Sequence, residues 1–173
     1  MEADERFPQE LADEIRQRAG NEPGIAGYWM PFKNYVFGRL MRSDFWFFRK
    51  IKLYRKDNGS WQDRRVHTQF VLEGQAGELH NFVEHFPYPD LKIFLMKLNR
   101  YTRLEALELR RIGYCLDLLD LLKAVGWIPL IFWKHYVTWK GYRDGVTGLA
   151  LAVLTSPYNL LVKLKYLFGR KDA

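Results

Sequence analysis

Three groups of side chains in this chain have types and spacing that can do chemistry. Glu2 and Asp4 stand one residue apart, so both carboxylates can face one divalent cation, and hard oxygen ligands suit Mg²⁺ or Mn²⁺. Asp63 offers a carboxylate that can take a proton as a general base. Arg64 and Arg65 offer guanidinium groups that match phosphate oxygens. Each group also has a plainer interpretation. Glu2 and Asp4 can simply interact favourably with the dipole of the following helix. Asp63 can be a solvated carboxylate in a turn, and Arg64 and Arg65 can lie on a solvated strand edge.

Two histidines are further candidates. His67 and His85 carry imidazole nitrogens that can complete the shell of a metal ion. His85 lies close to Phe82 and Phe86 in the sequence, where a histidine with a purely structural role is the ordinary case. The single cysteine, Cys115, excludes a disulfide framework and a cysteine metal site, and its apolar surroundings predict that it is buried.

The charge is concentrated in the second half of the chain. Residues 1–90 hold 13 Lys and Arg against 14 Asp and Glu, whereas residues 91–173 hold 14 against 6. A basic half indicates a polyanionic neighbour. Its many Trp, Tyr, Phe and Leu residues favour an anionic membrane surface over nucleic acid.

The first half must position these groups with short strands and one helix. Pro8 suits a first helical turn, and the pattern after it predicts an amphipathic helix ending near Gly20. Strands are expected over residues 25–32, 50–56, 67–74 and 77–86, with an aromatic segment over 34–40 and a turn over 57–60. The fold class is therefore α/β.

From about Pro89 the pattern is helical. We expect one amphipathic helix to about Gly113, a second over 116–140 that is interrupted near Gly126 and Pro129, and a third over 144–168 kinked at Pro157. No uninterrupted run of 18 apolar residues exists, so a helix lying on or dipping into one leaflet is favoured over a membrane span.

Aromatic residues are dense in the last two helical stretches. They can form core or contact a headgroup boundary, and the sequence favours neither. The residues concerned are Trp127, Phe132, Trp133, Tyr136, Trp139 and Tyr142.

Five segments together resemble one family. In chain order they are EADERFPQELADEI at 2–15, YRKDNGSWQDRRVHTQF at 54–70, NFVEHFPYPDL at 81–91, KLNRYTRLEALEL at 97–109 and GYRDGVTGLALAVL at 141–154. The chain thereby resembles family 2 glycosyltransferases of the lipopolysaccharide-core type over nearly its whole length.

The resemblance implies a domain plan. Residues 1–88 correspond to the C-terminal part of a GT-A type catalytic domain, and residues 89–173 to long amphipathic helices that meet the acceptor and the membrane. In the family, the strands that bind the base and ribose precede the DADER-like segment, and Met1 stands where the strand carrying that segment ends. We therefore expect an incomplete GT-A domain that alone turns over nucleotide sugar negligibly.

The resemblance also implies residue roles. Glu2 and Asp4 correspond to the DxD metal pair, with Glu2 in place of the family's first Asp, and His85 is the third expected ligand of Mg²⁺ or Mn²⁺. Asp63 is the expected catalytic base, because Thr68 replaces the family's glutamate nearby. From their side-chain chemistry, Arg64 and Arg65 are expected to contact the donor phosphates or the anionic acceptor, and His67 the donor diphosphate.

The implied function is inverting transfer of a sugar from a nucleotide-sugar donor to a lipopolysaccharide-core or other membrane glycolipid. It would take place at the cytoplasmic face of the bacterial inner membrane, with the enzyme bound peripherally. The alternative is a non-catalytic remnant that binds membrane or glycolipid. Nucleic acid is not an expected partner, because no recognised motif supports it.

Overall fold

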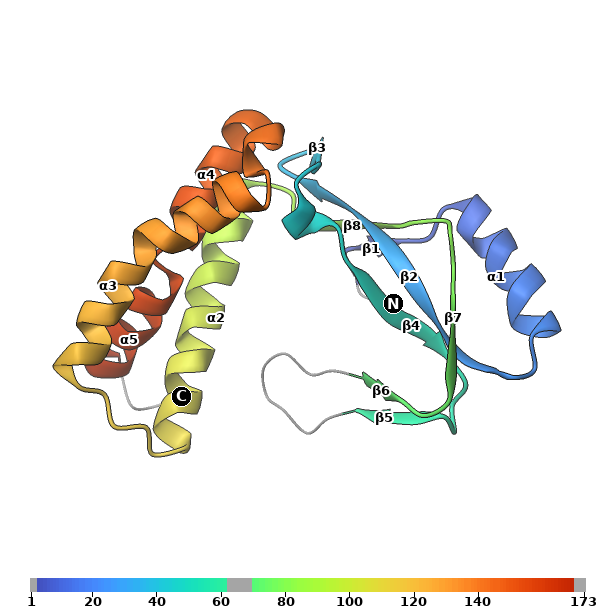
Figure 1. The fold of residues 1–173 in the computed structure, drawn as a ribbon, viewed down its shortest axis with the longest axis horizontal. Helices are drawn as coiled ribbons and strands as arrows, with labels where there is room; N and C mark the ends of the chain where they lie inside the picture. The colour runs from blue at the N-terminus through green and yellow to red at the C-terminus, as the bar shows by residue number, and fades with distance from the viewer. Residues whose placement is uncertain (1–2, 62–69, 170–173) are drawn as a thin grey trace. The chain divides into compact units, whose positions relative to one another are not determined.

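The computed structural model describes residues 3–61 and 70–169. The chain forms two compact units: unit 1 holds Met1–Met41 and Trp46–Pro87, and unit 2 holds Arg42–Phe45 and Tyr88–Ala173. In Figure 1, unit 1 is drawn chiefly in blue to green and unit 2 in yellow-green to red.

Unit 1 is a mixed α/β unit built on one long strand, β2 (Ile25–Val36). Strand β4 (Arg49–Tyr54) pairs with it antiparallel, and β7 (Gln75–Glu78) pairs with it parallel. Strand β8 (Val83–Tyr88) also pairs with β2 and carries the short β1 (Glu5–Arg6) on its other side. A separate antiparallel hairpin joins β5 (Gly59–Trp61) and β6 (Phe70–Leu72).

The expected aromatic segment over 34–40 is not a separate element. Asn34–Val36 continues β2, and a two-residue turn leads into β3 (Arg39–Leu40). Phe37 and Gly38 both have positive φ angles, 52° and 74°, as a tight hairpin with the sheet's natural twist requires. Gly38 adopts this backbone conformation without steric cost.

The core of unit 1 lies between one face of β2 and helix α1 (Gln9–Asn21). Met30, Phe32, Asn34 and Val36 alternate along β2 and are almost fully buried. Leu11 of α1 is completely buried in the same cluster as Met30 and Phe32. The predicted helix after Pro8 is thus confirmed, with Pro8 at its N-cap.

The prediction of one strand over 77–86 is wrong. Strand β7 ends at Glu78 and β8 begins at Val83. Between them, the Glu14 carboxylate accepts hydrogen bonds from the backbone N–H groups of His80 and Asn81, both at 2.8 Å. These two donors are therefore satisfied by α1 instead of by a strand ladder.

Unit 2 is helical. Its elements are η1 (Asp44–Trp46, shared with unit 1), α2 (Leu91–Arg111), α3 (Leu118–Trp133), η2 (Lys134–Thr138), η3 (Gly141–Asp144), α4 (Gly145–Thr155) and α5 (Tyr158–Phe168). Helix α2 packs against α5, where the Arg110 guanidinium donates to the carbonyls of Tyr166 and Gly169. We expected one helix kinked at Pro157, and the structure has two helices, α4 and α5, with Ser156 and Pro157 between them.

Two expectations for unit 2 are wrong. We expected an interruption near Gly126 and Pro129, but α3 continues through both residues, and a π-helix follows it only from Lys134. Cys115 is exposed. Gly113 takes a φ of 68°, and the N–H of Tyr114 donates to Leu109 O, so α2 ends in a Schellman motif that leaves Cys115 in a loop.

One stretch of unit 2, Gly141–Phe168, is long and apolar enough to associate with a membrane. It comprises η3, α4 and α5, and 33% of its most apolar window is buried inside the protein. Length and composition alone carry this finding.

Candidate functional site

The pairing of β1 with β8 brings Asp4 to His85. Glu5 lies opposite His85 in the antiparallel register, and the N–H of Phe86 donates to Asp4 O at 2.8 Å. The Asp4 carboxylate oxygen Oδ2 lies 3.8 Å from His85 Nε2. Two candidate ligands from opposite ends of unit 1 therefore converge at one sheet edge.

Asn34 determines the orientation of the His85 ring and which ring nitrogen carries a proton. Its amide Nδ2 donates to the carbonyl oxygen of Trp46 at 2.5 Å, and its Oδ1 lies 2.6 Å from His85 Nδ1. The Trp46 carbonyl can only accept, which assigns Nδ2 to that side and Oδ1 to the histidine. Because Oδ1 also only accepts, the proton sits on Nδ1. The other ring nitrogen, Nε2, lies on the side of the Asp4 carboxylate.

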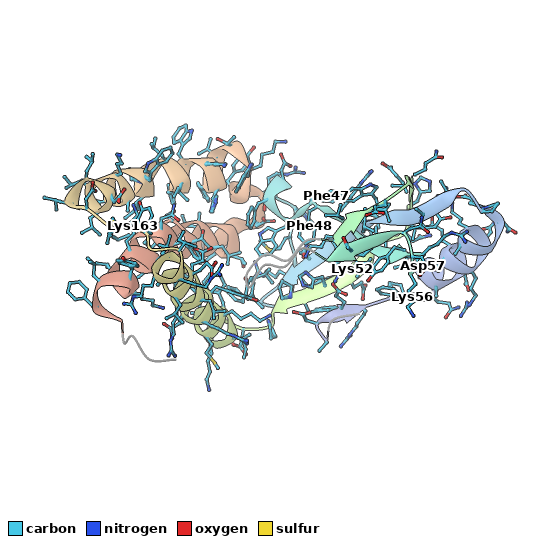
Figure 2. The ribbon with its side chains drawn as sticks, turned by 90° about the horizontal axis from the view of Figure 1, so that it is seen from below. Phe47, Phe48, Lys52, Lys56, Asp57 and Lys163 are labelled. Atoms are coloured by element: carbon cyan, nitrogen blue, oxygen red, sulfur yellow. The ribbon has the colours of Figure 1, made fainter. Side chains whose placement is uncertain are left out.

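Aromatic rings enclose the histidine. Phe32 meets His85 edge-on, with ring centroids 5.8 Å apart, and Phe48 does the same at 6.4 Å. Phe32 and Phe48 stack on each other at 5.1 Å. Figure 2 labels Phe47 and Phe48, which directly precede β4. These contacts restrict the rotation of the imidazole.

A buried ion pair lies beside Asp4. Lys52 Nζ is 2.7 Å from Glu5 Oε1, and the Glu5 side chain is 1% exposed. Lys52 extends from β4, as Figure 2 shows, ahead of Lys56 and Asp57 in the following turn. The pair holds the two-residue strand β1 against the sheet and so fixes the backbone position of Asp4.

The structure places two of the seven predicted site residues. Asp4 and His85 are described, and they lie together. Glu2, Asp63, Arg64, Arg65 and His67 lie outside the described residues, as does Thr68. Among residues 3–61 and 70–169, no group of three or more His, Cys, Asp and Glu side chains could hold a metal ion.

Three residues of this site, Asn34, Phe48 and Lys52, were not predicted from the sequence. Asn34 carried a usable signal, because it is the one polar residue among the alternating buried positions 30, 32, 34 and 36 of β2. A polar side chain at such a position needs a hydrogen-bonding partner, and its partner here is His85.

No model of a known protein family matches this chain, and no solved structure matches it. The chemistry of the site therefore rests on its own geometry.

Proposed function

We propose that these residues belong to a glycosyltransferase that moves a sugar, with inversion, from a nucleotide-sugar donor to a lipopolysaccharide-core or other membrane glycolipid. The observation that best supports this proposal is the convergence of Asp4 and His85, with Asn34 orienting the histidine. The mixed sheet and helix of unit 1 agree with a GT-A type domain. The five family-like segments add to the argument.

The donor atoms fit Mg²⁺ or Mn²⁺. Asp4 would supply a carboxylate oxygen and His85 would supply Nε2, and these two atoms lie 3.8 Å apart. Glu2 belongs to the same proposed ligand set. When bound, the cation would offset the charge that develops on the leaving nucleoside diphosphate. The proposed role of Asn34 is to orient His85 for the cation, and the proposed role of the Glu5–Lys52 pair is to hold Asp4 in place.

Asp63 remains the proposed base. Its carboxylate would take the proton of the acceptor hydroxyl while that oxygen bonds to the anomeric carbon and the nucleoside diphosphate leaves. Arg64, Arg65 and His67 are the proposed contacts of the donor phosphates.

Unit 2 is the proposed acceptor side. A glycolipid acceptor lies in a membrane, and nucleotide sugars are supplied from the cytoplasm, so peripheral binding at the cytoplasmic face of the inner membrane fits the excess of cations in residues 91–173. The exposed apolar side chains of unit 2 also favour a second candidate, a non-catalytic module that binds membrane or glycolipid.

Three substitutions in the natural protein that contains these residues test the proposal. Asp4→Asn should weaken metal-dependent donor binding, whereas Asp63→Asn should abolish transfer and largely spare donor binding, because a base acts in the transition state. Asp57→Asn, in an exposed turn, is the control. Donor binding is measured by calorimetry and transfer by the mass of the acceptor.

Normal transfer in both site variants would contradict the proposed roles. Absence of transfer by the unaltered natural protein, with vesicle binding intact, would favour the non-catalytic module.

A further inference from the structure

Helix α3 turns an apolar surface outward. Its 16 residues include only two charged side chains, Asp120 and Lys123, both near its start. Among its residues only Ala124 is buried. Leu130 is 58% exposed and Trp133 is 62% exposed. A soluble helix usually places such residues against the core, so α3 reverses the ordinary pattern.

The exposed residues form a continuous stripe. Leu119, Leu122, Leu130 and Trp133 recur at spacings that place them on one side of a helix, and all are more than half exposed. Gly126 and Pro129 occupy the same side between them and are exposed as well. We call this stripe the α3 face.

Polar bonds hold α3 at both ends. At its start, Lys163 of α5 donates to Asp120 O at 2.7 Å, and the Tyr114 hydroxyl bonds to Asp120 Oδ2 at 2.8 Å. Figure 2 labels Lys163 within unit 2. Beyond its end, His135 Nδ1 lies 2.9 Å from Thr155 Oγ1 of α4. These bonds attach α3 and the segment after it to α5 and α4, and so hold the α3 face in its exposed orientation.

Helix α2 is also exposed to solvent, but its exposed surface is not purely apolar. It is longer than α3, yet its sequence places charged residues throughout its length. Two exposed members of that helix are Arg100 and Arg103. Exposed apolar residues also occur on the other helices of unit 2, such as Met96 of α2, but on α2 they lie among charged residues, whereas α3 has no charged residue after Lys123.

We infer that the α3 face is the surface by which this protein enters a lipid bilayer, lying in the plane of one leaflet. The apolar part of this helical segment, α3, is about 24 Å long before Lys134 and His135 of η2 follow it, which is shorter than the hydrocarbon core of about 30 Å, so α3 lies along the boundary and does not cross it. The inference deepens the proposed function and rests on it for the lipid-linked acceptor.

The chemistry around the α3 face favours lipid over a second copy of the chain. Lys134, Lys140 and Arg143 follow α3 and are exposed, and Tyr142 is 53% exposed among them. Trp, Tyr and basic residues at the border of an apolar surface match the headgroup layer of an anionic membrane. Two copies meeting through this face would gather the same cations at its border.

The test is co-sedimentation with vesicles of phosphatidylglycerol and phosphatidylethanolamine. Leu130→Asp on α3 is compared with Met96→Asp on α2, because each of the two native side chains is 58% exposed. We expect Leu130→Asp to lower the partition coefficient about tenfold and Met96→Asp to change it less than about twofold. High salt should weaken binding without abolishing it, because apolar insertion is not screened.

A second readout locates the contact. Brominated acyl chains should quench the tryptophan fluorescence, and Trp133→Phe should remove more of that quenching than Trp29→Phe, at an exposed position of unit 1. Equal losses in the paired variants, or complete release by salt, would overturn the inference. So would a stable dimer in solution that Leu130→Asp dissociates. Mn²⁺ binding by unit 1 is independent of these results, so either claim can fail alone.

Discussion

The two units depart from ordinary burial in opposite directions. In unit 1, the whole-residue exposure is 1% for Asn34 and 5% for Glu5, although both residues are polar. In unit 2, Leu130 and Trp133 are 58% and 62% exposed, although both are apolar. Both patterns run against the usual distribution of these residue types.

This difference in burial indicates whether the interaction partners of these residues lie inside or outside the protein. A buried polar group needs partners inside the protein, and Asn34 and Glu5 have them in His85, Trp46 and Lys52. An exposed apolar stripe gains its partner from outside, and for α3 we propose lipid. Unit 1 thus satisfies its unusual residues internally, and we propose that unit 2 does so through a contact outside the protein.

The largest expected effect on stability is at the buried ion pair. Glu5→Gln leaves the Lys52 charge without its carboxylate, and we expect a loss of about 3 kcal/mol in the free energy of unfolding. Asp13→Asn removes the exposed partner of Arg16 and should cost less than about 0.5 kcal/mol. Urea unfolding measures both. A small loss in both variants would remove the contrast between buried and exposed polar groups.

Asn34→Leu tests the positioning of His85. Loss of the amide should release the ring and lower the affinity for Mn²⁺ about 10–100-fold, as for other residues that orient metal ligands. Nitrogen-15 NMR of the histidines should show the proton of His85 on Nδ1 in the unaltered protein and a mixture of tautomers in the variant. A proton on Nε2 in the unaltered protein would refute the role of Asn34.

Glu14 should make unit 1 sensitive to acid. Burial disfavours its ionised form, but the backbone N–H groups of Asn81 and His80 outweigh burial and lower the pKa of Glu14. The ionised carboxylate therefore stabilises the fold above the ordinary glutamate pKa, about 4.3, and this contribution is lost as pH falls through the lower folded-state value. Glu14→Gln should destabilise the protein at pH 7, and the difference should shrink towards pH 3. Thermal melts across this range measure it, and a constant difference would contradict the assignment.

The smallest effect is expected on the exposed stripe. Leu130→Asp should change the free energy of unfolding by no more than about 0.5 kcal/mol, because the side chain lies mostly in solvent. A loss of several kcal/mol in the same urea titration would mean that Leu130 is part of a core.

Periodicity predicted most of the helices, but it did not predict the contacts around His85. Leu91, Phe94 and Leu98 recur at helical spacing, and α2 follows that pattern. The contact between Asn34 and His85 depends on which strands pair and in which register, and neither is encoded in a local pattern. Cys115 was misplaced for a related reason, since the Schellman turn at Gly113 ends α2 before an apolar run that continues in the sequence.

The central claim is that Asp4 and His85 together hold a divalent cation, and titration of Mn²⁺ followed by electron paramagnetic resonance tests it most directly. The unaltered chain should bind Mn²⁺, and both Asp4→Asn and His85→Gln should weaken binding at least about tenfold. Asp13→Asn and His80→Gln change an exposed carboxylate and an exposed imidazole, and should leave binding unchanged. No binding by the unaltered chain, or equal losses in the site variants and the controls, would contradict the account.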